Sequence, residues 1–304
     1  MRGCERGVAG VLVGALVLLA SACSGSVRQG DLQDSESVIT GLTVAGQPGT
    51  APTVRMRTPL KVDDTTSGVT VTGTGAPIQV DQLFVLELTL YDARTGKLAL
   101  STYDTGVAVA AKSSDDRLFP ALSDALVGVR QGSRLVLAAT AADAFATGGV
   151  PPKGVRRDDP VVVVADVVAV PPATVLKVID GTAVTPAAGT PAPVVSAGLV
   201  AGIDFTGVRR PAKPVAQVLV QGSGPAIAAH DLVTVHFVAQ RSRQHDPFED
   251  TFFKEPEQVA IGAGTAPAAW DQLLVGVHRG SRLVLYGPDG NGMIAWVVDV
   301  LGVS

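Results

Sequence analysis

The sequence predicts an α+β protein made of two tandem domains, each an antiparallel sheet wrapped on one short helix. The first observation is a duplication. LVGVRQGSRLVL, from Leu126 to Leu137, returns as LVGVHRGSRLVL, from Leu274 to Leu285, with ten of twelve positions identical. Second, both copies consist mainly of short, valine-rich runs bounded by Gly, Pro, Asp or Asn, which is typical of strands. Third, each copy has one helical pattern, directly before the repeated stretch.

The chain begins with features of an export signal. Arg2 and Arg6 precede an apolar run from Val8 to Ala20, and LASAC then ends at Cys23. This pattern predicts a signal peptide over 1–22 and resembles the lipobox of bacterial lipoproteins. The resemblance implies a lipid on Cys23 and attachment to the extracytoplasmic face of a membrane bilayer. The alternative is an ordinary cleaved signal with an incidental cysteine.

Composition narrows the choice of partners. The formal net charge is −4, and lysine and arginine form no basic stripe, so nucleic acid is an unexpected partner. The four histidines are scattered without ligand spacing, so no metal site is predicted. Aromatic residues make up only 4% of the chain, which favours valine-rich sheets over large aromatic cores.

Further pairs of similar stretches extend the duplication to domain size. VTGTGAPIQVDQLFVLEL, from Val71, resembles VQGSGPAIAAHDLVTVHF, from Val220, and VVADVVAV resembles WVVDVLGV near the end of each copy. The predicted strands include FVLELTL, SRLVLAA and PVVVVADVVAV in the first copy, and LVTVHFVA, SRLVLY and AWVVDVLGV in the second. The predicted helices are PALSDALVGV and PAAWDQLLVGV, each beginning with a proline, a residue that suits a first helical turn.

These elements divide the chain after the signal into four parts. A polar tether covers 23–50, the first domain 51–172, a Pro- and Ala-rich linker 173–212, and the second domain 213–304. The linker is expected to connect the two domains and to contribute an early strand to the second one. The loop after Leu285 is about half as long as its counterpart after Leu137.

The second copy resembles the peptidyl-prolyl isomerase domain of the FKBP type. The stretches VTVHFVA, PFED, WDQLLVGVHRGSRLVL and WVVDVLGV follow the order of that family's motifs. The resemblance implies rotation about X–Pro bonds in proline-containing polypeptides. That rotation needs an apolar pocket and no cofactor, nucleophile or metal.

The family's pocket residues can be carried over position by position. In the second copy they imply catalytic roles for Phe237, Phe248, Glu249 and Trp270. The remaining substrate-binding positions fall on Ala266, Pro267 and Val298 of that copy, and on Phe119 and Phe145 of the first copy. The alternative for Trp270 is a purely structural place in the core.

Several positions depart from the family's pattern. Glu257 stands where the family has Phe, and Pro267 where it has an isoleucine whose N–H contacts the ligand, although proline has no N–H. The first copy has Leu88 and Leu122 in place of the pocket Tyr and Trp. We therefore expect weak isomerase activity in the second domain, assisting exported proteins. The alternatives are a non-catalytic chaperone or binding module, and a structural lipoprotein of the envelope.

Overall fold

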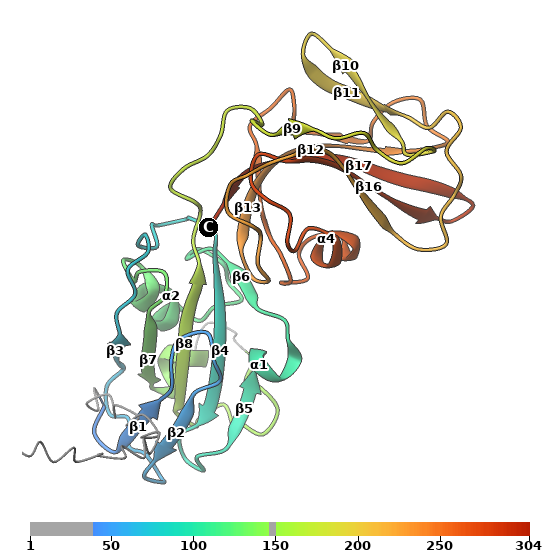
Figure 1. The fold of residues 1–304 in the computed structure, drawn as a ribbon. Coiled ribbons are helices and arrows are strands. Elements are labelled where there is room, and N and C mark those ends of the chain that lie inside the picture. The colour runs from blue at the N-terminus through green and yellow to red at the C-terminus, as the bar shows by residue number, and fades with distance from the viewer. Residues whose placement is uncertain (1–38, 146–149) are drawn as a thin grey trace, which may run out of the picture. The chain divides into compact units, whose positions relative to one another are not determined.

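The computed structural model describes residues 39–145 and 150–304. The predicted signal peptide, Cys23 and the first part of the tether lie outside the described residues. The described part contains two larger antiparallel sheets, one for each copy of the duplicated sequence (Figure 1). The prediction of an α+β fold with two tandem domains is confirmed.

The first sheet has six strands in the order β3-β7-β8-β4-β5, with β6 paired to β4. Its members are β3 (Thr66–Val71), β4 (Phe84–Asp92), β5 (Leu98–Ser101), β6 (Val109–Ala111), β7 (Arg134–Ala139) and β8 (Val161–Ala169). The three predicted strands of this copy coincide with β4, β7 and β8. They are the central strands, which are buried along nearly their whole length.

The second sheet has seven strands in the order β14-β13-β17-β16-β12-β9, with β15 paired to β13. Its members are β9 (Thr182–Ala183), β12 (Val215–Gln221), β13 (Leu232–Arg241), β14 (Glu249–Asp250), β15 (Glu257–Ala260), β16 (Arg282–Asp289) and β17 (Gly292–Val303). The predicted strands of this copy coincide with β13, β16 and β17, and they occupy places equivalent to those of β4, β7 and β8.

The helix of each copy packs on one face of its sheet. The two predicted helices are confirmed as α2 (Pro120–Leu126) and α4 (Ala268–Leu273). Pro120 opens α2, whereas Pro267 stands one place earlier, at the N-cap of α4. Two short helices in the first copy, α1 (Thr102–Thr105) and α3 (Ala141–Phe145), were not predicted. None of the helices in the described part of the chain has the length and hydropathy needed to span a membrane.

The opposite face of each sheet is covered by a hairpin that the sequence analysis missed. In the first copy, β1 (Leu42–Ala45) pairs with β2 (Thr53–Met56), and in the second, β10 (Ala192–Ser196) pairs with β11 (Leu199–Asp204). The ranges assigned to a tether and a linker therefore contain strands of these hairpins. The linker range also contains β9, which is the early strand expected there for the second copy.

Apolar burial explains why these hairpins form. Leu42 and Val44 pack on Val136 and Val164 of the first sheet. In the second copy, Val200 and Ile203 of β11 pack on Val284 and Val297, which are equivalent to those two sheet residues. Both faces of each sheet are thus covered, which accounts for the unbroken run VVVV in β8, because a strand buried on both faces does not alternate.

The repeated GSR stretch is held in each copy by a glycine that comes just after an edge-side strand of the sheet, β3 in the first copy and β12 in the second. The backbone N–H of Gly73 donates to the Ser133 hydroxyl at 2.9 Å, and the N–H of Gly222 donates to the Ser281 hydroxyl at 2.9 Å. These contacts are equivalent in the two copies, and they are part of the reason that the scaffold sequence is shared.

Substituting either of these glycines with alanine is expected to cost about 3 kcal/mol of unfolding free energy, by overpacking. A Cβ on Gly73 would lie 2.1 Å from the Gln131 carbonyl oxygen, and a Cβ on Gly222 would lie 2.2 Å from that of Arg279. Urea denaturation of Gly73→Ala and Gly222→Ala measures the cost. Gly292→Ala is the control, because its Cβ would come no closer than 3.3 Å to a side chain. Equal stability of all three variants would contradict the prediction.

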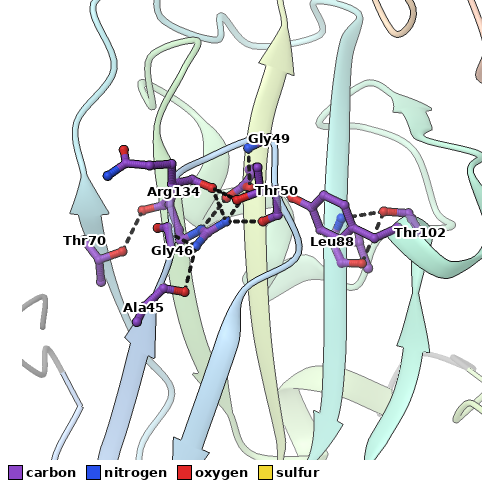
Figure 2. Close-up of polar contacts among 11 residues, drawn as sticks. Ala45, Gly46, Gly49, Thr50, Thr70, Leu88, Thr102 and Arg134 are labelled. Carbon is purple, nitrogen blue, oxygen red and sulfur yellow. Dashed lines mark hydrogen bonds and ion pairs between the residues drawn. The ribbon is translucent and has the colours of Figure 1, made fainter. Parts of the chain in front are cut away.

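An arginine fixes the segment between β1 and β2 to the first sheet (Figure 2). Arg134 donates to the carbonyl oxygens of Gly46 at 2.8 Å and Thr50 at 2.7 Å, and to Asp166 through Nε and Nη2, each at 2.7 Å. It also donates to the carbonyl oxygens of Ala45 and Gln47. A segment more than 80 residues away in sequence is thereby tied to β7 and β8.

Candidate functional site

The second sheet brings three of the predicted site residues together. Phe237 on β13 lies opposite Val298 on β17 in the strand register. The helix α4 places Trp270 edge-on to Phe237, with ring centroids 5.2 Å apart and an interplanar angle of 88°. Such an edge-to-face pair is a favourable aromatic arrangement. The three side chains belong to one hydrophobic cluster between sheet and helix.

The cluster formed by Phe237, Trp270 and Val298, called the aromatic floor from here on, is closed to solvent. Trp270 is 1% exposed, Phe237 4% and Val298 0%. The indole Nε1 of Trp270 is buried and has no hydrogen-bond partner among the described residues, which is costly for a polar group. A proline ring could reach the indole only after neighbouring side chains had moved.

The two residues before α4 stand at the edge of this floor. Ala266 is half-buried and packs against the cluster. Pro267 is exposed, and its carbonyl oxygen accepts a hydrogen bond from the backbone N–H of Trp270 at 2.7 Å. Because proline has no N–H, this position cannot give a ligand the main-chain donor that the FKBP resemblance implies there.

Phe248 lies apart from the aromatic floor. Its ring is 44% exposed and carries the Arg241 guanidinium 4.4 Å above its centroid. Its own N–H donates to the Ala239 carbonyl oxygen at 3.0 Å. The ring therefore makes a cation–π contact at the surface, while Trp270 packs on Phe237.

Two carboxylates share the face of the sheet that bears the floor. Glu249 lies opposite Ala239, and Glu257 lies opposite Val235, in the antiparallel register. Directly opposite residues point to the same side of a sheet, and both Ala239 and Val235 belong to the aromatic cluster. The sequence analysis treated Glu257 only as a departure from the family's pattern. The available signal was that Glu257 stands two residues before Val259, because residues two apart in a strand face the same side of the sheet.

The environment of Glu257 changes its acidity. Partial burial raises the pKa of Glu257 above its ordinary value, and the nearby charge of Glu249 raises it further. Glu257 is thus protonated more easily than a carboxyl group with the ordinary pKa.

This raised pKa predicts a pH dependence of stability. A carboxyl whose pKa is higher in the folded state binds more protons there, so the unfolding free energy falls as pH rises and the group loses its proton. This loss of stability begins near pH 4.5, the ordinary pKa of the group, and continues until the pH passes the raised pKa of the folded state. Glu257→Gln is expected to gain stability relative to the wild type between about pH 4 and pH 7, as measured by urea denaturation. A difference that stays constant with pH would contradict this expectation.

The first domain has an aliphatic counterpart of the floor. Leu88, Leu122 and Ala165 occupy the places of Phe237, Trp270 and Val298, and they belong to the core of this copy. Phe119 forms the N-cap of α2 and packs against the same core. Phe145 ends α3 and is 4% exposed. Both predicted phenylalanines therefore lie in the first domain, and no aromatic floor accompanies them among the described residues of this domain.

The described residues contain no group of three or more His, Cys, Asp or Glu side chains that could hold a metal ion.

Comparisons with known proteins place the chain among relatives. No family model matches it. It is 31% identical over 87 residues to an "FK506-binding protein" of Streptomyces anulatus, which is 28% of this chain and 70% of the relative. Among solved structures it is similar to the three FKBP domains of wheat FKBP73, at 14% identity and a TM-score of 0.32, over 82% of this chain and 98% of that one. It is also similar to FkpA from Escherichia coli, at 18% identity and a TM-score of 0.31, over 38% and 50% of the two chains.

Proposed function

Because this chain belongs to the FKBP family of peptidyl-prolyl isomerases, we propose that its second domain is a slow cis–trans isomerase of X–Pro bonds in polypeptides. The observation that carries the proposal is the Phe237–Trp270 pair on Val298, at the place of the family's pocket. An apolar floor lowers the barrier by taking the prolyl amide out of water, since the twisted amide has lost its C–N double-bond character.

Three features account for the low rate that we propose. The Trp270 ring is 1% exposed, so substrate entry requires rearrangement of the cluster. The N-cap residue Pro267 provides no N–H. The carboxylate of Glu257 stands on the site's face of the sheet, where its charge disfavours an apolar ligand.

We further propose that the protein works on exported polypeptides, held at the outer face of the plasma membrane by a lipid on Cys23. The motif LASAC after an apolar run supports this, and two or more acyl chains on one cysteine suffice for stable anchoring. Mass spectrometry of the intact protein extracted from membranes should find the mature chain heavier by its lipid. An unmodified Cys23 would refute the anchor.

A non-catalytic binding module is the second candidate, and the burial of the floor favours it. Phe237 and Trp270 are both at most 4% exposed, as in a core. In this case the domain would bind polypeptides through its surface and leave the rate of proline isomerisation unchanged.

Trp270→Leu separates the two candidates, because the first domain already uses Leu122 at the same place. We expect the wild type to accelerate isomerisation of short X–Pro peptides, an uncatalysed event of tens to hundreds of seconds. Trp270→Leu should lose most of that acceleration, roughly 10-fold or more, in a protease-coupled or NMR exchange assay.

Leu122→Met is the matched control, since it changes the equivalent residue of the first domain by a volume-conserving swap. It should leave the rate unchanged, and circular dichroism should show both variants folded. If Trp270→Leu keeps the full rate, the floor is not the site. If the wild type itself gives no acceleration, the binding module is the function to pursue.

A further inference from the structure

The two domains differ at one edge of their sheets. In the second sheet, β12 is covered by β9, with Val220 opposite Ala183 and Gln221 opposite Thr182. The N–H of Val184 also donates to the Leu219 carbonyl oxygen at 2.9 Å. In the described part of the first sheet, the equivalent strand β3 is the last one and pairs only with β7 (Figure 1). An edge strand presents a row of N–H and C=O groups that can pair with another chain.

A groove runs beside this edge on the helix side of the sheet. Its volume is about 620 Å³. It lies between the start of β3 and the helices α2 and α3, and its lining includes Thr65, Ser67, Pro120, Asp124, Ala125 and Asp143. Side chains of an added strand would alternate across the sheet, so every second one would face this groove.

The groove is acidic. Asp124 is exposed on α2, and no lysine or arginine is among the residues that line the groove. Asp143 accepts hydrogen bonds from the hydroxyls of Thr65 and Thr140, which hold the pKa of Asp143 below its ordinary value. Both carboxylates are therefore positioned to form ion pairs with basic side chains of a bound segment.

We propose that β3 and this groove bind an extended basic segment of a partner polypeptide, which adds a strand to the first sheet and places lysine or arginine beside Asp124 and Asp143. Strand addition supplies affinity through main-chain hydrogen bonds, and pockets for alternate side chains supply selectivity. In the second sheet the same edge accepts main-chain pairing at the C-terminal end of β12, where β9 pairs with Val220 and Gln221. The bound segment lacks proline at the pairing positions, since proline has no N–H.

The charge of the groove argues against the chain's own N-terminal region as the occupant. Counting back from Thr182 and Ala183 by the offset of 149 between β12 and β3 leads to positions 33 and 34. The stretch GDLQDSESV, from Gly30 to Val38, carries Asp31, Asp34 and Glu36 and no basic residue. Its charge has the same sign as that of Asp124 and Asp143, so a basic partner fits the groove better.

Fluorescence anisotropy with the whole chain tests the proposal. The probe is a labelled, proline-free octapeptide that alternates Lys with Val or Thr, and it has two N-methylated forms, one for each set of alternate residues. We expect one N-methylated form to lose at least about 10-fold in affinity and the other to bind like the parent, because only alternate N–H groups face the edge. Equal binding of all three would overturn strand addition.

Two charge variants and a competitor complete the test. Asp124→Lys should weaken binding roughly 10-fold, whereas Asp158→Lys, an equal charge change on an exposed loop before β8, should stay within about 2-fold. Equal weakening would mean non-specific attraction and would overturn the site. The free peptide GDLQDSESV should not displace the probe, and displacement would assign the edge to the chain itself. Because the probe contains no proline, these outcomes are independent of isomerase activity in the second domain.

Discussion

Arg134→Met is expected to lower the unfolding free energy of the first domain by about 3–5 kcal/mol, because Asp166 would remain buried without its ionic partner. The side chains of Arg134 and Asp166 are 1% and 2% exposed. Asp166 also accepts the Gly49 N–H at 2.7 Å and the hydroxyl of Tyr103. The substitution would therefore also release the segment between β1 and β2, whose carbonyl oxygens Arg134 binds (Figure 2).

The same position of the second copy provides the matched control. Arg282 donates to Asp299 through Nε at 2.6 Å and Nη2 at 2.7 Å, but its side chain is 18% exposed. We expect Arg282→Met to cost less, about 1–3 kcal/mol. Both tryptophans, Trp270 and Trp296, lie in the second domain, so tryptophan fluorescence follows that domain and circular dichroism follows both. Equal costs for the two arginine variants would show that the carbonyl contacts of Arg134 add nothing.

Glu257→Phe is expected to raise kcat/KM for X–Pro peptides by about 10-fold, which corresponds to roughly 1.4 kcal/mol of transition-state stabilisation. Glu257 lies opposite Val235, on the face that carries Phe237. A phenylalanine there would extend the apolar surface and remove a carboxylate whose charge is already disfavoured by burial and by Glu249. The measurement is the isomerisation rate against enzyme concentration at neutral pH.

Glu255→Phe is the control for this gain. Glu255 is exposed in the loop before β15, so the same substitution adds an aromatic ring and removes a charge outside the strand register. Its rate should match that of the wild type. An equal gain in both variants would mean that any exposed aromatic ring near the domain suffices, and the role of Glu257 at the rim would be rejected.

Much of the fold was predictable because its signals are local. The copies of GSRLVL at the start of β7 and β16, and the valine runs of β8 and β17, carry strand patterns within a few residues. The hairpins β1–β2 and β10–β11 were not predicted, since their segments are rich in Gly, Pro, Ala and Thr and lack a clear strand pattern. Their formation depends on the outer face of a sheet built from residues far away in sequence. The unbroken VVVV run was the one sequence signal that this face would be covered.

The candidate site was predictable only in part. The structure brings Phe237, Trp270 and Val298 together, because strand pairing and one helix are enough to place the three side chains in one cluster. The family's register could not predict that the indole would be 1% exposed, since burial depends on how every neighbour packs. Nor did it predict the cation–π contact of Phe248, which depends on where the Arg241 side chain lies.

The sequence by itself determined the duplication, the stretches that form the central strands and the helix that precedes each GSR stretch. Only the tertiary structure decided what identical residues do in the two copies. Arg134 and Arg282 occupy the same motif, yet the first is enclosed by carbonyl oxygens from 45–50, and the second stays partly exposed. Likewise β3 and β12 are equivalent strands, but only β12 is covered by a further strand in the described part of the chain. The physical reason is that a residue's burial and a strand's pairing depend on distant segments, which local sequence patterns do not encode.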